Sequence, residues 1–239
     1  MRGPPKSDRV YGVLRQRIRD IALAPGTLLA KEQIAAELGV SRAPVSEALA
    51  RLAEERLVDI FPQHGSFVAE IRADDIREAL FLRAALEVEA IRRSASLRDQ
   101  ALCAALEANL EAQSQALAGH DLRKFYELDE ALHERILAAS GCARVGKLLD
   151  AARAPLDRMR QLTLPKGERA GATLREHRWI VEAIKSGDPE FAGAAMRAHL
   201  NAVADAIEEQ LRALSQGCAV RGINGRKNPA EVLTPASAR

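Results

Sequence analysis

Hydrophobic residues recur at every third or fourth position through most of the first 55 residues of the chain. Val10, Leu14 and Ile18 fall on one face of a helix, which the run Ala24-Pro25-Gly26 would stop. Gly39 separates the two helical runs that follow. The pattern predicts helices at about 8–23, 31–38 and 42–55.

The hydrophobic period changes to two in the next segment. LVDIF (57–61) and SFVAEI (66–71) flank PQHG (62–65), a short loop that ends in glycine. Alternation on both sides of such a loop is typical of a β-hairpin. Helices followed by a hairpin give the element order of a winged helix-turn-helix, which we predict for residues 8–70.

From residue 75 to residue 214 every segment shows helical periodicity, with glycine and proline at the breaks. We therefore predict a mainly α protein, whose second domain is an all-helical antiparallel bundle. Its helices are expected at about 75–95, 98–118, 121–139, 142–163, 170–186 and 188–214. The predicted plan is a flexible arm at 1–7, the winged helix-turn-helix at 8–70, a linker at 71–75, the helical domain at 76–215 and a disordered tail at 216–239.

The composition agrees with this plan and argues against a disulfide-rich scaffold and against a membrane protein. Hydrophobic residues make up 47% of the chain but aromatic residues only 3%, so alanine and aliphatic residues must fill the core. Three cysteines without paired spacing favour a reducing cytoplasm over a disulfide scaffold. No apolar run is long enough to cross a bilayer, so no membrane partner is expected. The net charge of +2 is compatible with nucleic-acid contact but does not demonstrate it.

The segment ELGVSRAPVSEAL (37–49) fits the corner of a helix-turn-helix. Such a corner needs a small residue where the helices cross, a turn residue that tolerates positive φ, and an apolar anchor on the second helix. Ala35, Gly39 and Val45 stand at these places. The second helix would present its first residues to the DNA major groove, and these are Ser41, Arg42, Ala43, Pro44 and Ser46. The alternative is an ordinary helix–helix connection, which the hairpin directly after it disfavours.

Three helices of the second domain each aim ionisable residues toward the interior. Asp129 and His133 are four residues apart, on or beside the apolar stripe of one helix. His177 shares a face with the apolar residues of the next-to-last helix, and His199 does the same on the last. For any one of these histidines alone, a buried ring with one hydrogen bond is the simpler interpretation.

Together the four residues indicate a metal site. Burying three histidines and an aspartate without a shared partner would cost on the order of several kcal/mol. A divalent cation would satisfy all four at once, and three imidazoles with one carboxylate suit Zn²⁺, Ni²⁺ or Mn²⁺. We predict that Asp129, His133, His177 and His199 bind such an ion.

Residues 25–58, PGTLLAKEQIAAELGVSRAPVSEALARLAEERLV, followed by PQHGSFV at 62–68, resemble the DNA-binding domain of bacterial GntR-family regulators. The resemblance implies major-groove contacts from Arg42 and its neighbours. It also implies minor-groove contacts from His64 and Gly65 at the tip of the wing. For His64 the alternative is an ordinary solvated loop residue.

Two positions depart from the family's usual pattern in this domain. Ser46 stands where an arginine is common, which puts one expected base or phosphate contact in doubt. Lys31 stands where an acidic residue is common, and it could supply a phosphate contact from the neighbouring helix. The operator sequence therefore cannot be taken from relatives.

The segments LDEALHERILAASG (128–141), EHRWIVEAIKSGD (176–188) and AMRAHL (195–200) resemble the FCD effector-binding domain of the FadR subgroup of GntR regulators. In metal-binding members an aspartate and three histidines hold the ion, and those places match the four residues above. The resemblance implies a small carboxylate or hydroxy acid as effector, and a homodimer on a palindromic operator. It also implies a regulator that is most often a repressor.

Two alternatives in the helical domain stay open. Arg83 is a candidate anchor for the effector carboxylate, with an intrahelical pair to Glu87 as the alternative. An Asp/His₃ metal site could also activate water in a hydrolase-like enzyme, although no spare base is evident and the winged domain would then have no role. A helical interaction module without metal would predict that His177→Ala and His199→Ala barely change stability or metal content. We predict a regulator and not an enzyme.

Overall fold

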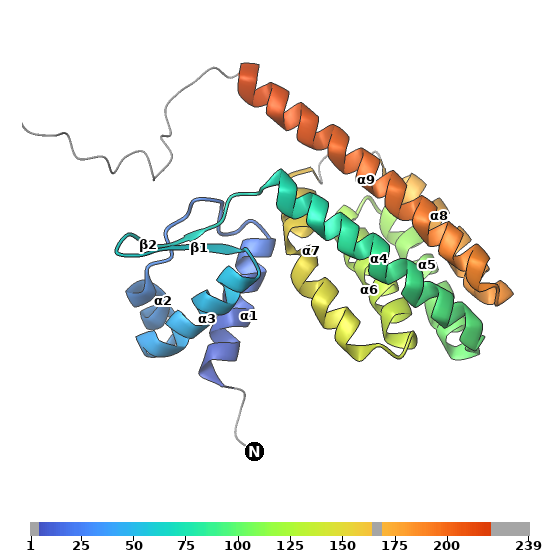
Figure 1. Cartoon of the computed structure of the whole chain (residues 1–239), viewed down its shortest axis with the longest axis horizontal. Helices are drawn as coiled ribbons and strands as arrows, with labels where there is room; N and C mark the ends of the chain where they lie inside the picture. Colours follow the sequence, from blue (N-terminus) through green and yellow to red (C-terminus); the bar gives the residue numbers. More distant parts are fainter. Residues whose placement is uncertain (1–4, 164–168, 221–239) are drawn as a thin grey trace, which may run out of the picture. The chain divides into compact units, whose positions relative to one another are not determined.

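The computed structural model describes residues 5–163 and 169–220. The chain divides into two compact units, Met1–Asn201 and Ala202–Arg239. The first unit contains every predicted site residue, in a winged helix-turn-helix and a helical domain, while the second contains the end of the last helix. The mainly α fold with one small hairpin is confirmed (Figure 1).

The winged domain places three helices against a two-stranded antiparallel sheet. In the hairpin, Val58 lies opposite Val68 and Phe61 lies opposite Gly65. The apolar stripes of the three helices, with Val10 and Leu49 fully buried, form one core together with Val58 and Val68 of the two strands. The elements are α1 (Lys6–Arg19), α2 (Lys31–Leu38), α3 (Arg42–Glu54), β1 (Val58–Phe61) and β2 (Gly65–Val68).

The corner between α2 and α3 has the predicted chemistry. Gly39 ends α2 in the left-handed region, with φ 62°. The Val40 N–H then donates to the Ala35 carbonyl over 3.0 Å, which turns the chain toward α3. Val45 is fully buried one turn into α3, so it anchors that helix. The first residues of α3 are thereby left at the surface.

The first helix is shorter than predicted, because it ends at Arg19 and not at residue 23. Ile21 has φ 58°, and the Leu23 N–H donates to the Arg17 carbonyl over 3.0 Å. Ile21 fits the helical spacing but belongs to the turn that ends the helix. Leu23 packs against the core from beyond that turn, so hydrophobic spacing alone overestimated the helix.

The helical domain contains the six predicted helices, and their bounds agree with the prediction to within a few residues except at the end of the last. Asp99 and Asp121 accept backbone N–H groups at the starts of α5 and α6. Helix α5 packs on α6 and α8, and α4 packs on α6, α7 and α8. The helices are α4 (Ala73–Leu97), α5 (Gln100–Ala118), α6 (Leu122–Ala139), α7 (Ala143–Thr163), α8 (Ala170–Ser186) and α9 (Pro189–Val220).

Several predicted domain boundaries shift. Helix α1 begins inside the predicted arm, and α4 begins at Ala73, inside the predicted linker. Helix α9 continues through Val220, so residues 216–220 are helical and not part of a disordered tail. A single glycine such as Gly217 costs a helix only about 1 kcal/mol and does not end it alone. The rest of the predicted arm and tail, 1–4 and 221–239, lies outside the described residues.

Among the described residues, none of the helices combines the length and the hydrophobicity that spanning a bilayer requires.

Candidate metal centre and DNA-contacting surface

The four predicted ligand residues meet at one buried point of the helical domain. Asp129 and His133 come from α6, His177 from α8 and His199 from α9. Their exposed fractions are 5%, 1%, 0% and 1%. Each offers one ligand atom, and the four atoms all lie within 4.8 Å of one another. The fold therefore brings together all the residues that the sequence predicted for this site.

Helix geometry explains the convergence. Asp129 and His133 are one turn apart and face the same side of α6, while His177 and His199 face them from α8 and α9. The ring centres are 5.4 Å apart for His133 and His177, 5.2 Å for His133 and His199, and 4.9 Å for His177 and His199. Metal–nitrogen bonds of about 2.1 Å put ligand atoms about 3–4 Å apart. Small side-chain shifts would close this cluster on one ion.

An oxygen acceptor from another side chain faces Nδ1 of each histidine. The pairs are His133 with Glu87 at 2.7 Å, His177 with Gln113 at 2.9 Å and His199 with Glu176 at 2.8 Å, measured from Nδ1 to the acceptor oxygen. A neutral imidazole that donates its Nδ1–H keeps its lone pair on Nε2. The hydrogen bonds of His177 and His199 therefore favour the tautomer that binds metal through Nε2, while Nδ1 of His133 lies close to the Glu87 carboxylate without a hydrogen bond.

The opposite nitrogen of each ring lacks such a partner. Nε2 of His133, His177 and His199 is buried and has no hydrogen bond among the described residues. His177 Nε2 lies 3.3 Å from Asp129 Oδ1. Each unsatisfied buried nitrogen costs roughly 1–3 kcal/mol. One cation at the centre would partner all three nitrogens and the carboxylate, so the residues fit a divalent metal ion.

The local electrostatics favour the protonation states that metal binding requires. Burial lowers the pKa of His133 to about 3, despite its carboxylate neighbours, and burial also lowers the pKa of His199. Burial raises the pKa of Asp129, but Arg160 and the adjacent histidines reverse this, and the net pKa lies well below its usual range. At neutral pH these two imidazoles are uncharged and the carboxylate is ionised. Metal ligands need this state.

Three arginines form ion pairs with Asp129 of the cluster and with the neighbouring Glu87. Arg160 Nη2 lies 3.2 Å from Asp129 Oδ2. Arg83 Nε and Arg153 Nη2 lie 2.8 Å and 3.1 Å from Oε1 of Glu87. All three arginines line a cavity of about 10 Å³ next to the cluster. This volume holds about one water molecule, so an organic acid could enter only if arginine side chains moved.

The predicted effector anchor, Arg83, is buried and forms the intrahelical pair with Glu87 that was its alternative. Because Arg83 also lines the cavity, its contact with an effector stays a prediction.

The sequence analysis missed the residues that support the cluster. These are Gln113, Glu176, Arg153, Arg160 and, in its role toward His133, Glu87. A signal existed for Gln113, since it follows Leu106 and Asn109 at helical spacing on the buried face of α5. A polar side chain on such a face requires a partner. The identity of that partner depends on how α5 meets α8.

The Gln113 contact predicts a loss of metal affinity when it is removed. Gln113→Leu keeps a side chain of similar size but leaves Nδ1 of His177 without its acceptor. We expect the dissociation constant for Zn²⁺ to rise about 10- to 100-fold, measured by competition with a chromogenic chelator. Gln115→Leu, at an exposed position of the same helix, is the matched control. Equal affinities of the two variants would show that the contact does not support the site.

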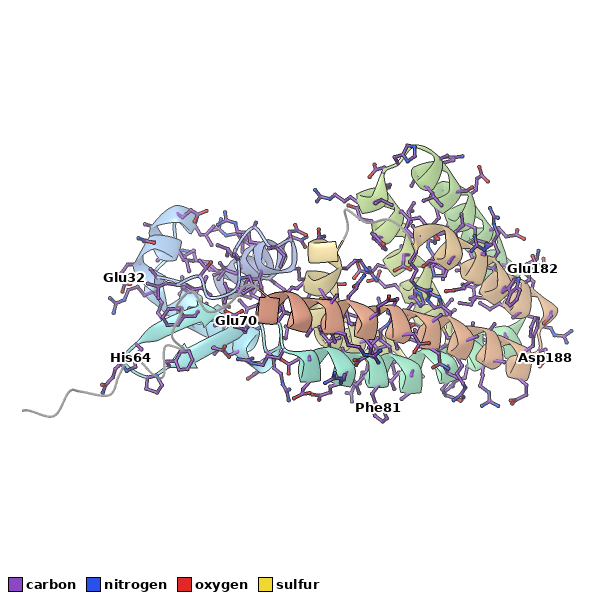
Figure 2. All side chains as sticks on the ribbon, turned by 90° about the horizontal axis from the view of Figure 1, so that it is seen from above. Glu32, His64, Glu70, Phe81, Glu182 and Asp188 are labelled. Atoms are coloured by element: carbon purple, nitrogen blue, oxygen red, sulfur yellow. The ribbon has the colours of Figure 1, made fainter. Side chains whose placement is uncertain are left out.

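The predicted DNA-contacting residues lie on α2, at the start of α3 and at the hairpin tip. Ser41, Arg42, Ala43, His64 and Gly65 are exposed, while Lys31, Pro44 and Ser46 are half-buried. Arg42 Nη1 lies 3.0 Å from Glu32 Oε1, and both side chains are largely exposed. Glu32 and His64 lie toward the same end of the winged domain (Figure 2). Their contact with DNA stays a prediction.

A winged helix-turn-helix followed by an all-helical domain with a buried Asp/His cluster is the domain arrangement of a bacterial transcriptional regulator. The chain belongs to the GntR family. Residues 6–68 match the family "Bacterial regulatory proteins, gntR family", and residues 78–202 match the FCD domain. GntR regulators bind DNA, usually as dimers, and FCD domains bind small-molecule effectors and often a metal.

Individual relatives agree with this assignment. An uncharacterized HTH-type transcriptional regulator in an unstable DNA locus of Streptomyces ambofaciens is 39% identical over 83% of this chain and 84% of its own. The HTH-type transcriptional repressor RspR of Escherichia coli K12 is 32% identical over 86% and 90%. The fold resembles E. coli McbR/YncC (TM-score 0.74, 19% identity, 87% and 99% covered) and a putative GntR regulator from Rhodococcus sp. RHA1 (0.72, 25%, 85% and 97%). This protein is a transcriptional regulator and not an enzyme, which answers the hydrolase alternative.

Proposed function

We propose that this regulator is a repressor that binds a palindromic operator as a homodimer and responds to a small organic acid at a divalent metal. The observation that carries the proposal is the buried Asp129, His133, His177 and His199 cluster, in which three Nε2 atoms lack hydrogen bonds. An apolar helical module would have no use for four such groups at one point. A sensor domain needs a site of this kind.

The four side chains would hold Zn²⁺, Ni²⁺ or Mn²⁺ through three Nε2 atoms and one carboxylate oxygen. Bound there, the ion supplies positive charge and open coordination positions to an effector carboxylate. Arg83, Arg153 and Arg160 lie at the same cavity and are the candidate charge partners of the remaining carboxylate oxygens. The small volume of the cavity means that effector binding must displace at least one of these arginines.

The repressor role is supported by the printed name of one relative, the repressor RspR, with which this chain shares 32% identity. A less similar relative at 27% identity is the gluconate operon transcriptional repressor of Bacillus subtilis. In a dimer the two copies of α3 would enter successive major grooves about one DNA turn apart. Effector binding shifts operator occupancy only if the free and DNA-bound arrangements differ in effector affinity.

The direct test first requires an operator sequence, which has to be identified experimentally. Sequences selected from random duplex DNA by the full chain supply a target, and its affinity is then measured with Zn²⁺ or with EDTA. Citrate, malate and lactate serve as probes of the acid class, and glycerol serves as the uncharged control. We expect at least one acid to lower operator affinity with Zn²⁺ and none to do so with EDTA. An acid response that is unchanged by EDTA would contradict a metal-dependent sensor.

Operator binding is expected to depend steeply on salt. Contacts from Lys31, Arg42 and their neighbours on two copies would neutralise several phosphates. With about six phosphates, affinity should fall about 10³-fold between 50 and 200 mM salt. Fluorescence anisotropy with a labelled duplex measures this directly. A flat salt response would count against specific contact with DNA.

A further inference from the structure

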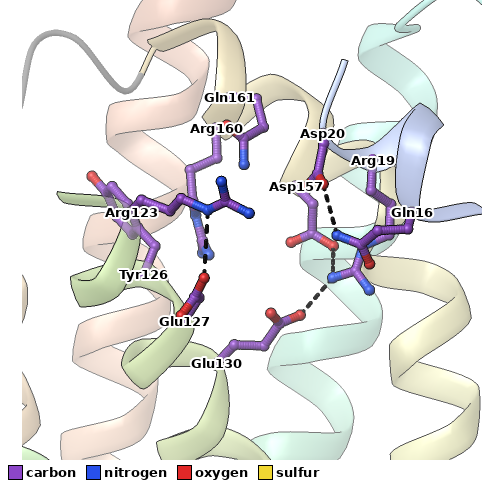
Figure 3. Close-up of a pocket in the computed structure, with 10 residues that line it drawn as sticks. All are labelled: Gln16, Arg19, Asp20, Arg123, Tyr126, Glu127, Glu130, Asp157, Arg160 and Gln161. Carbon is purple, nitrogen blue, oxygen red and sulfur yellow. Dashed lines mark hydrogen bonds and ion pairs between the residues drawn. The ribbon is translucent and has the colours of Figure 1, made fainter. Parts of the chain in front are cut away.

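A thin layer of side chains separates the cluster of Asp129, His133, His177 and His199 from the first helix of the winged domain. A cavity of about 130 Å³ lies between α1, α6 and α7 (Figure 3). Three of its lining residues, Glu130, Asp157 and Arg160, also line the small cavity beside the cluster. These three residues therefore border both cavities.

On the winged-domain side the layer is held by Arg19, near the end of α1. Its Nη2 lies 2.7 Å from Glu130 Oε1 and 2.5 Å from Asp157 Oδ2, and its side chain is only 15% exposed. Figure 3 shows this guanidinium between the two carboxylates. Charges that are mostly withdrawn from water interact more strongly than surface pairs. Arg19 thus fastens the end of α1 to α6 and α7.

On the metal side the layer is held by Arg160. Its Nη2 lies 3.2 Å from Asp129 Oδ2, and its guanidinium carbon lies 4.8 Å from the centre of the Tyr126 ring. Burial raises the pKa of Asp157, and both Arg19 and Arg160 oppose that rise. Asp157 and Arg160 are three residues apart on α7 and line the same two cavities, so Asp157 lies beside both guanidinium groups.

We propose that Arg160 is a positioning residue that passes the state of the metal site to the winged domain. This inference rests on the proposed function, because it requires a cation at the four-residue cluster. Without a cation, Asp129 holds Arg160. Once a cation engages the Asp129 carboxylate, Arg160 loses this partner and is repelled from the site. Asp157 and Glu130 line both cavities together with Arg160, so a displaced Arg160 competes with Arg19 for these two carboxylates and the end of α1 is held less firmly.

The backbone around Arg160 suits this role. Pro155 lies inside α7 and lacks the N–H that would bond to the preceding turn, which loosens the helix at that point. The turn that follows carries contacts in both directions. Asp157 binds Arg19, and Arg158 Nη2 donates to the Ala69 carbonyl directly after β2 over 2.5 Å, while Arg160 binds the metal ligand. One turn of α7 therefore touches the winged domain and the site.

Hydrogen exchange of the full chain tests the proposal, with Zn²⁺ alone as the probe and EDTA as the reference. In the wild-type protein we expect Zn²⁺ to speed amide exchange in the second half of α1 about two- to fivefold, the effect of weakening one partly buried ion pair. In Arg160→Gln this acceleration should vanish although the variant still takes up Zn²⁺, which titration verifies. Arg160→Lys, which keeps the charge, should restore part of it.

Two further variants make the result specific. Arg19→Gln removes the pairs with Glu130 and Asp157 but leaves the Arg15–Asp150 pair, so the end of α1 should exchange faster than in the wild type, and by the same factor with or without Zn²⁺. Arg123 lines the same cavity but pairs with Glu127, so the variant Arg123→Gln should respond to Zn²⁺ like the wild type. If wild-type protein binds Zn²⁺ and α1 does not respond, or if Arg160→Gln responds like wild type, the inference is wrong while the proposed function stands. If wild-type protein binds no Zn²⁺, the proposed function fails and this inference with it.

Discussion

His177→Ala is expected to lower the affinity for Zn²⁺ by about two to three orders of magnitude. Four-ligand Zn²⁺ sites contribute about 10–16 kcal/mol, so one ligand of four accounts for about 2.5–4 kcal/mol. Zn²⁺ at 1,000 times its dissociation constant should stabilise the wild-type protein by about 4 kcal/mol. In a domain of this size this raises Tm by about 10 °C. Differential scanning calorimetry with Zn²⁺ and with EDTA measures the difference.

The same measurement on a histidine outside the cluster provides the control. His120 is exposed in the turn before α6 and has φ 56°, so His120→Asn keeps a residue that tolerates this conformation. We expect His120→Asn to show the full Zn²⁺ stabilisation and His177→Ala to show little of it. If Zn²⁺ raises the Tm of both variants by the same amount, Zn²⁺ binds elsewhere and the helical domain is a module without a metal site.

Arg42→Ala is expected to weaken operator binding about 30-fold to 10⁴-fold. Arg42 is the exposed first residue of α3, where an arginine can clamp a phosphate or bind guanine. Each lost contact of this kind costs about 1–3 kcal/mol, and a dimer would lose two. The fold should not change, because the Arg42–Glu32 pair is largely exposed and such pairs contribute about 0–1 kcal/mol. Anisotropy titration with the selected duplex measures the loss.

Glu32→Gln separates DNA contact from the loss of this ion pair. The variant breaks the same pair but removes a negative charge from the surface that we propose faces the phosphates. Its operator affinity should match or exceed that of the wild type, and both variants should keep the wild-type Tm. Similar losses of affinity in the two variants would mean that the Arg42–Glu32 pair shapes α3 and that Arg42 does not touch DNA.

Local signals in the sequence were sufficient for most of the helices and for the clustering of the four candidate ligand residues. The four-residue spacing of Asp129 and His133 is enough to place them on one face of a helix. His177 and His199 interrupt apolar stripes that must point inward. Gly39 similarly marks the corner, because a left-handed turn residue favours glycine. These inferences need only the geometry of one helix or one turn.

Contacts between side chains of different helices could not be predicted from the sequence in this way. Arg160 binds Asp129 and Gln113 binds His177 because particular turns of α7, α5 and α8 meet, and no local spacing encodes those meetings. The early end of α1 at Ile21 has a related cause, since an apolar residue can fit a helical pattern and still serve a turn. Arg83 shows the limit most clearly, because both a pair with Glu87 and a ligand contact fitted its position.

Anomalous X-ray scattering at the zinc absorption edge, from crystals of the full chain grown with Zn²⁺, tests the central claim most directly. The account predicts one strong peak per chain, about 2.0–2.2 Å from the Nε2 atoms of His133, His177 and His199 and from a carboxylate oxygen of Asp129. It also predicts that Arg160 has left Asp129 in that structure. A helical domain with no peak at this point, or with peaks only on surface residues, would contradict it.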